Sequence, residues 1–128
     1  PTYGCADYIV RDLYREENGW WDRNPTTLHP SPPDQTAFEI LSALGDPATV
    51  VNRAKELAQG GRTQLALHVI DLVALAPGDD PVVAEARAVK AELCRVRSDE
   101  VEPFVSKSCY RSSARLLDEG HTSWQDLP

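Results

Sequence analysis

Residues 19–33 read Gly-Trp-Trp-Asp-Arg-Asn-Pro-Thr-Thr-Leu-His-Pro-Ser-Pro-Pro, and they hold two of the three tryptophans and four of the ten prolines in the chain. Proline lacks a backbone N–H and pushes the residue before it towards extended geometry, so this stretch cannot be a regular helix. The adjacent Trp20 and Trp21 indicate one indole in a core and one at an edge or interface. We therefore predict an ordered, extended Trp/Pro segment over residues 19–33.

Polar side chains within the Trp/Pro segment favour local turns. Asp22 and Asn24 can accept hydrogen bonds from nearby backbone amides, and Asn24-Pro25 is a turn-initiating pair. The plainer interpretation is an inter-helix loop anchored by its aromatic residues, and the functional one is an interface. We nominate six residues for this structural or interface role: Trp20, Trp21, Asp22, Asn24, Pro25 and Leu28.

Outside this segment, apolar residues recur at helical spacing, and glycine, proline or capping residues separate the runs. No strand pattern competes with them. The fold class predicted is all-α, with about six helices arranged in antiparallel hairpins. The expected helices cover residues 5–18, 34–44, 47–59, 63–76, 81–96 and 100–119.

The apolar faces of the predicted helices differ in width. Apolar residues cover more than one face of 63–76, which predicts a central helix packed from two sides. Residues 81–96 carry a narrow heptad-like seam that suits one neighbouring helix, in this chain or in a partner. That seam comprises Val82, Ala86, Val89, Leu93 and Val96. The expected buried stripe of 34–44 comprises Ala37, Phe38, Leu41 and Leu44.

A repeated helix-start device suggests a structural repeat. Asp46-Pro47 and Asp80-Pro81 each place a capping carboxylate before a proline suited to the first helical turn. The two devices lie 34 residues apart (46 to 80), which is the period of tetratricopeptide repeats. Leu65 stands where that repeat expects a small residue. We predict one tetratricopeptide-like helix pair and not an array.

The composition and charge of the chain limit the kinds of partner that it can bind. The chain has 128 residues, 41% of them hydrophobic and 26% charged, as expected of one globular domain. Acidic residues outnumber basic ones 20 to 13, giving a net charge of −7, which disfavours nucleic acid as a partner. No apolar run suits a membrane span and no signal peptide is recognisable, so the compartment, cytoplasmic or periplasmic/secreted, stays open. The missing methionine indicates a piece of a longer chain.

Catalytic and metal-binding patterns are absent from the sequence. His29, His68 and His121 lie far apart and form no zinc-binding motif, so we expect no metal or cofactor in this chain. We expect His68 to be partly buried in a helix and His29 to pack near the prolines. Three widely spaced cysteines, Cys5, Cys94 and Cys109, are expected to be buried free thiols.

The sequence also carries a family resemblance. Gly19-Trp20-Trp21-Asp22, Asn24-Pro25, Leu28, Pro30 and Pro32-Pro33 resemble the signature that opens the dimerisation domain of alkyl sulfatases, enzymes of the metallo-β-lactamase superfamily. The resemblance extends over nearly the whole chain. It includes Tyr3-Gly4, the Gly60 hairpin, Leu75-Ala76-Pro77, Tyr110, Ala114 and Gly120. The chain departs from the family pattern at Cys94-Arg95-Val96 and at Ser112-Ser113.

This resemblance implies a helical dimerisation domain over residues 1–120, followed by a tail or linker over 121–128. It implies a homodimer and an upstream metallo-β-lactamase-like domain that holds the zinc and hydrolyses alkyl sulfate esters, with a lipid-carrier-like domain commonly following. This chain would then be a scaffold without catalytic residues of its own. Tyr3 is a weak candidate for the substrate entrance, and packing of a chain-end aromatic on the first helix is the plainer interpretation.

A second function of another class stays open, namely a stand-alone repeat-like adaptor that binds a peptide or a partner helix. Such an adaptor would use outward polar residues along the helix at 47–59. The candidates there are Asn52, Arg53 and Lys55.

Overall fold

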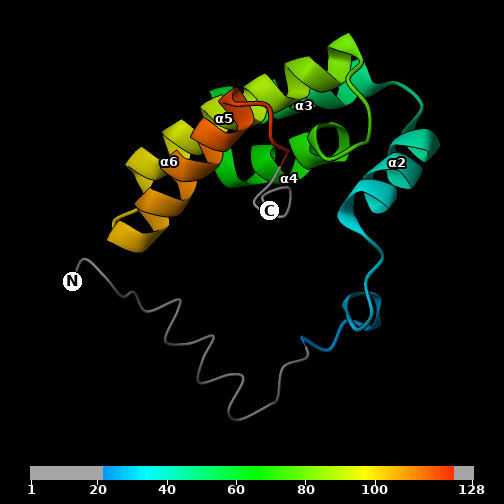
Figure 1. The fold of residues 1–128 in the computed structure, drawn as a ribbon, viewed down its shortest axis with the longest axis horizontal. Helices are drawn as coiled ribbons and strands as arrows, with labels where there is room; N and C mark the ends of the chain where they lie inside the picture. Colours follow the sequence, from blue (N-terminus) through cyan, green and yellow to red (C-terminus); the bar gives the residue numbers. More distant parts are fainter. Residues whose placement is uncertain (1–21, 123–128) are drawn as a thin grey trace.

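The computed structural model describes residues 22–122. The predicted helix 5–18, Tyr3, Cys5, Trp20, Trp21 and residues 123–128 lie outside them. The described chain is all-α, as predicted, and consists of five α-helices and one 3-10 turn (Figure 1). The elements are η1 (Pro25–Thr27), α2 (Pro33–Leu44), α3 (Pro47–Gln59), α4 (Thr63–Ala74), α5 (Pro81–Glu100) and α6 (Phe104–Asp118).

The predicted breaks between helices are mostly confirmed. Asp46 caps α3, because its Oδ1 accepts a hydrogen bond from the Ala48 amide at 3.0 Å and Pro47 occupies the first helical position. Gly61 adopts a φ of 78°, where a side chain would strain the backbone, and the chain turns there into α4. Asp80 precedes α5 in the same way, but its side chain makes no capping hydrogen bond. Asp80-Pro81 therefore repeats the position of Asp46-Pro47 before a helix but not its capping hydrogen bond.

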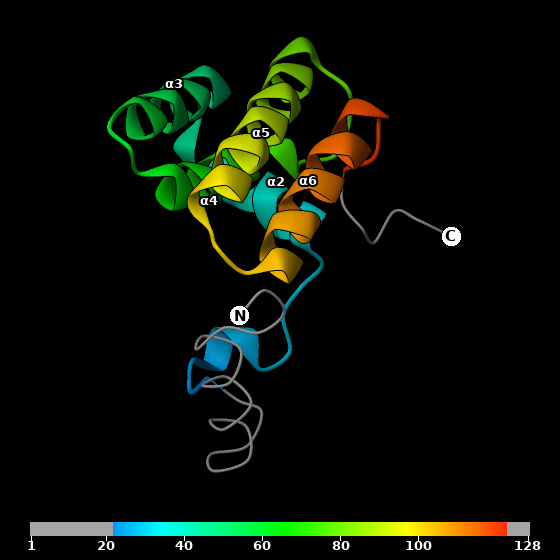
Figure 2. The same cartoon turned by 90° about the vertical axis from the view of Figure 1, so that its left-hand side faces the viewer.

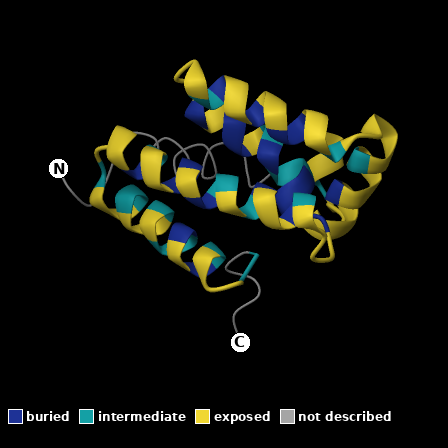
Figure 3. Cartoon of the chain, turned by 90° about the horizontal axis from the view of Figure 1, so that it is seen from above, coloured by how far each residue is buried: buried dark blue, intermediate teal, exposed yellow. Residues whose placement is uncertain are grey.

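The core lies where α4 is held between α3 and α5. Ala66, Ile70 and Val73 of α4 are fully buried, and Ala54 of α3 and Ala86 of α5 face them with no exposed surface. Figure 2 shows α6 lying along α5, on the side away from α3. Figure 3 shows the buried residues along the inward sides of these helices. The prediction that residues 63–76 form the central helix is confirmed.

The prediction of a narrow seam on the fifth helix is wrong. Helix α5 continues to Glu100 and packs against both α4 and α6, so it buries residues on two faces. Val96 of the predicted seam is 40% exposed. The buried residues of α5 are Val83, Ala86, Ala91, Leu93, Cys94 and Ser98.

The sixth helix also begins later than predicted. Ser98 and Asp99 lie inside α5, and α6 starts at Phe104. Pro103 restricts the residue before it to extended geometry, so a helix cannot run through Glu102. Lys107 of α6 donates to the Ser98 carbonyl at 2.9 Å and ties the two helices together across this break. The tetratricopeptide-like character of the α3–α4 pair stays a prediction.

Candidate interaction surfaces

The described part of the Trp/Pro segment forms a hydrogen-bonded turn. Asp22 Oδ1 accepts from the Asn24 amide at 2.9 Å and from the Thr27 hydroxyl at 2.6 Å, and Asn24 Oδ1 accepts from the Thr26 amide at 3.2 Å. The Thr27 hydroxyl, followed by the Asn24 amide, lowers the pKa of Asp22 because these bonds favour the carboxylate. The predicted backbone bonding of Asp22 and Asn24 is confirmed.

The four nominated interface residues that the structure describes lie together in this turn. Asp22, Asn24 and Pro25 are exposed, and Leu28 is half-buried. Pro25 starts η1, with Asn24 as its N-cap. Their surface is exposed to a partner, and the interface role stays a prediction.

The apolar face of α2 differs from the predicted stripe. Ala37 is buried and Leu41 is half-buried, whereas Phe38 is 54% exposed and Leu44 is 57% exposed. Ile40, which was not part of the stripe, is 43% exposed. The prediction of a buried stripe is wrong because α2 packs mainly against α4, and that contact buries Ala37 and only part of Leu41. Figure 1 shows α2 at the edge of the α3–α6 bundle, where the chain leaves it towards η1.

A hollow of about 1050 Å³ lies beside α2. The Trp/Pro segment, α2 and the C-terminal end of α4 provide its walls. His29 and Pro30 line it, and His29 is exposed. Phe38 and Ile40 of α2, Leu72 of α4 and Leu75 just after α4 line it with apolar side chains, and Asp34, Glu39 and Asp71 line it with carboxylates. The hollow thus connects the nominated turn with the exposed part of α2.

A smaller cavity of about 260 Å³ lies between α4, α5 and α6. Leu67, Leu116 and Leu117 line its apolar part. At its polar part, Lys90 Nζ lies 2.7 Å from Asp71 Oδ1, so the two charges neutralise each other. Cys94 also lines the cavity, and burial raises the pKa of its thiol, which keeps the sulfur protonated and unreactive.

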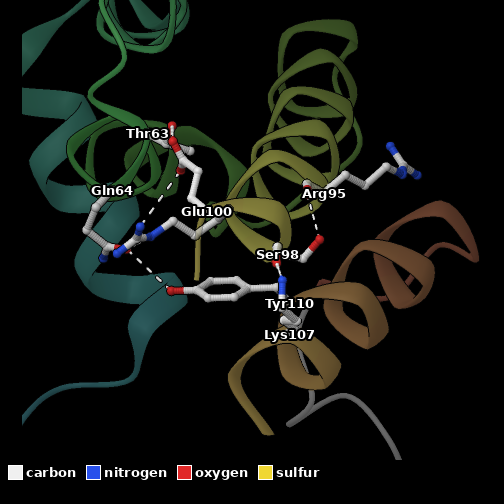
Figure 4. Close-up of polar contacts among 8 residues, drawn as sticks. Thr63, Gln64, Arg95, Ser98, Glu100, Lys107 and Tyr110 are labelled. Carbon is white, nitrogen blue, oxygen red and sulfur yellow. Dashed lines mark hydrogen bonds and ion pairs between the residues drawn. The ribbon is translucent and has the colours of Figure 1, made fainter. Parts of the chain in front are cut away.

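Polar side chains join the beginnings of α4 and α6 to the end of α5 (Figure 4). Gln64 Oε1 accepts from the Tyr110 hydroxyl at 3.5 Å and from Arg97 Nε at 3.4 Å, and the buried Thr63 donates to Glu100 at 3.1 Å. Each polar group has a partner inside the chain. We assign this cluster to holding three helices together and not to catalysis.

Two sequence predictions about single residues are wrong. His68 is exposed on α4, where its Nε2 lies 3.2 Å from Gln64 Nε2, and is not partly buried. Cys94 is buried as predicted, but Cys109 is exposed on the outward face of α6. Among residues 22–122, no group of three or more histidine, cysteine or acidic residues could hold a metal ion. In the same residues, no helix is both long and apolar enough to cross a bilayer.

These features define an all-α domain whose described residues present apolar surface and helix-joining polar contacts. A family model for alkyl sulfatase dimerisation matches residues 1–120. The chain belongs to the alkyl sulfatase dimerisation family.

Several alkyl sulfatases are similar to this chain in sequence or in structure. An alkyl/aryl-sulfatase of Saccharomyces cerevisiae is 27% identical over 118 residues, which are 92% of this chain and 18% of that protein. An (R)-specific secondary-alkylsulfatase of a Pseudomonas species is 25% identical over 92% of this chain and 17% of its own length. The solved structure of a variant sec-alkyl sulfatase shares the fold, with a TM-score of 0.81 and 24% identity over 93% of this chain and 18% of that chain. The chain therefore spans less than a fifth of the proteins it matches.

Proposed function

We propose that this chain is the dimerisation module of an alkyl sulfatase and forms a homodimer. The observation that carries the proposal is the match of residues 1–120 to the alkyl sulfatase dimerisation family. The exposed apolar residues of α2 support it, since a surface of this kind is typical of an interaction site. The parent enzyme would be a hydrolase of sulfuric esters.

The module would itself be a scaffold. Zinc chemistry needs three or four converging ligands, whereas His29 lies in a loop, His68 on α4 and His121 after α6. The described donor set does not fit a zinc site. In this proposal, zinc and hydrolysis belong to a catalytic domain of the parent enzyme. Tyr3 stays a weak candidate for a contribution to the substrate entrance and lies outside the described residues.

The adaptor alternative receives no specific support. On α3, Arg53 lies 3.0 Å from Glu56, and Lys55 lies 2.7 Å from Glu85 of α5. These cations have carboxylate partners inside the chain, so they give no specific observation in favour of a peptide site. We do not advance this function further.

The mass of the polypeptide in solution tests the proposal. Sedimentation velocity across micromolar concentrations is expected to give twice the mass of 14.1 kDa. Trp20→Ala and Trp21→Ala should shift the equilibrium towards the monomer. A monomer at every concentration would contradict self-association as a property of this chain.

A further inference from the structure

We propose that the exposed flanks of α2, together with the hollow beside it, form the surface on which a second copy of this chain docks, α2 against α2. This inference rests on the proposed dimerisation and adds where the two copies meet. Its centre is Phe38, Ile40 and Leu44, which are not among the six residues nominated from the Trp/Pro segment.

The distribution of residues around α2 shows how much of its apolar face is uncovered. At about 100° per residue, Ile40 lies about 60° to one side of the buried Ala37 and Phe38 about 100° to the other. Leu44 lies only about 20° from Ala37 but in the last turn of the helix. All three belong to one continuous apolar arc. Helix α4 packs on the middle of that arc and leaves both flanks open, since Ile40 is 43% and Phe38 is 54% exposed. Leu44, at the C-terminal end of α2, is 57% exposed.

The charge of the chain selects which surface can meet its own copy. Each copy carries a net charge of −7, so two copies repel unless they meet through an uncharged face. The charged residues of α2 are Asp34 and Glu39. Glu39 lies on the side opposite Ala37 by the same helical spacing, which keeps it away from the apolar arc. Asp34, in the first turn of α2, falls within the arc by the same spacing, and Asp34, Glu39 and Asp71 line the hollow. Two copies can therefore approach without opposing carboxylates only along the middle of α2.

The size of the surface explains why the hollow belongs to it. A helix of 12 residues is about 18 Å long, and a standard interface buries about 800 Å² on each partner. One helix face is too small for that area. The hollow of about 1050 Å³ extends the surface to the Trp/Pro segment, to Leu72 of α4 and to Leu75 just after it.

A two-fold axis near the middle of α2 would cover the exposed apolar residues of both copies with a single contact. In such an interface the same patch is used on each partner, so α2 of one copy fills the hollow beside α2 of the other. The nominated turn at Asp22–Leu28 would then lie at the rim of the interface. Its exposed polar residues suit that position, because rims are polar and solvated.

Two substitutions with equal starting exposure test the inference. Ile40 on α2 and Leu65 on α4 are both 43% exposed, and each can be changed to glutamate, a good helix former. We expect Ile40→Glu to raise the dimer dissociation constant at least about tenfold, because the charge enters the interface twice. Leu65→Glu should leave it within about twofold. The readout is sedimentation of the 128-residue chain.

A second variant, Leu44→Glu, repeats the test one helical turn further along α2. Circular dichroism at low concentration confirms that each variant keeps its helices. Dimers that survive both α2 variants would overturn the docking surface while leaving the proposed dimerisation intact. A wild-type chain that is monomeric throughout would instead contradict dimerisation itself, and α2 would then be a surface for another domain of the parent protein.

Discussion

Helices α2 and α4 have the same length of 12 residues and both carry many apolar side chains, yet they end in opposite environments. Helix α4 buries six residues, from Thr63 to Ala74, whereas α2 buries only Ala37. The difference lies in their neighbours, since α4 is enclosed by α3 and α5 and α2 packs at one edge of α4. Apolar content alone therefore does not decide burial. A helix with too few neighbours in its own chain is where a partner is expected.

The largest expected effect compares two isoleucines, one on each helix. Ile70 of α4 is fully buried and Ile40 of α2 is 43% exposed. Ile70→Ala should lower the free energy of unfolding by about 2–5 kcal/mol, because it removes buried methyl groups and leaves a cavity. Ile40→Ala, measured at concentrations where the chain is monomeric, should cost less than about 1 kcal/mol.

Urea unfolding followed by circular dichroism measures both variants. Equal losses at the two positions would mean that α2 is as firmly enclosed as α4 in the monomer, and the comparison between the two helices would fail.

The two described cysteines test the same contrast by chemical reactivity. In a Cys5→Ser background, Cys109 should react with a thiol reagent at the rate of an exposed thiol. Cys94 should react at least about a hundredfold more slowly, because it opens to solvent only when the core opens and because burial raises the pKa of its thiol. Mass spectrometry of the modified peptides over time separates the two sites. Similar rates would place Cys94 at the surface.

A smaller change in stability is expected from the residues that precede α3 and α5. Asp46→Ala removes the side-chain cap of α3 and should lower the free energy of unfolding by about 1 kcal/mol. Asp80→Ala, at the equivalent position before α5, is the matched control and should change it by less than about 0.5 kcal/mol, since Asp80 makes no capping bond. Thermal unfolding of the two variants checks the order. A larger loss at Asp80 would contradict the assigned cap.

Much of the fold follows from local signals in the sequence. Asp46-Pro47 and Gly60-Gly61 mark where α3 starts and stops, because caps and glycines act within one turn of the chain. The central place of Ile70 follows from apolar residues on more than one face of its helix. The family could be recognised from the Trp/Pro segment, and the match over residues 1–120 confirms it.

What could not be predicted depends on neighbours. Helical periodicity placed Phe38 and Leu44 on one face of α2 but could not say how much of that face α4 would cover. Likewise, Cys109 shares a helix with the buried Ala114 and still points outward. The signal in the sequence for Ile40 is the width of the whole apolar arc of α2, of which a four-residue stripe is only a part.

The smallest expected effect concerns the turn next to α2. Hydrogen bonds from Thr27 and Asn24 lower the pKa of Asp22, so its carboxylate stabilises the turn above the ordinary pKa of an aspartate. That contribution is lost as the pH falls through the lowered pKa of the folded chain. Thr27→Val removes the first of these bonds and should move the Asp22 pKa back towards its ordinary value, as followed by NMR titration.

Thr26→Val is the matched control, because the hydrogen bonds of Asp22 come from Thr27 and from the backbone at Asn24. Neither variant should change the unfolding of α3–α6, since the turn is held by bonds within residues 22–28 while the core is held by packing between helices. A Thr27→Val variant that lowers the stability of the core would show that the turn and the bundle form one cooperative unit. In that case contacts between the turn and the bundle would already stabilise the exposed surface around α2 in the monomer.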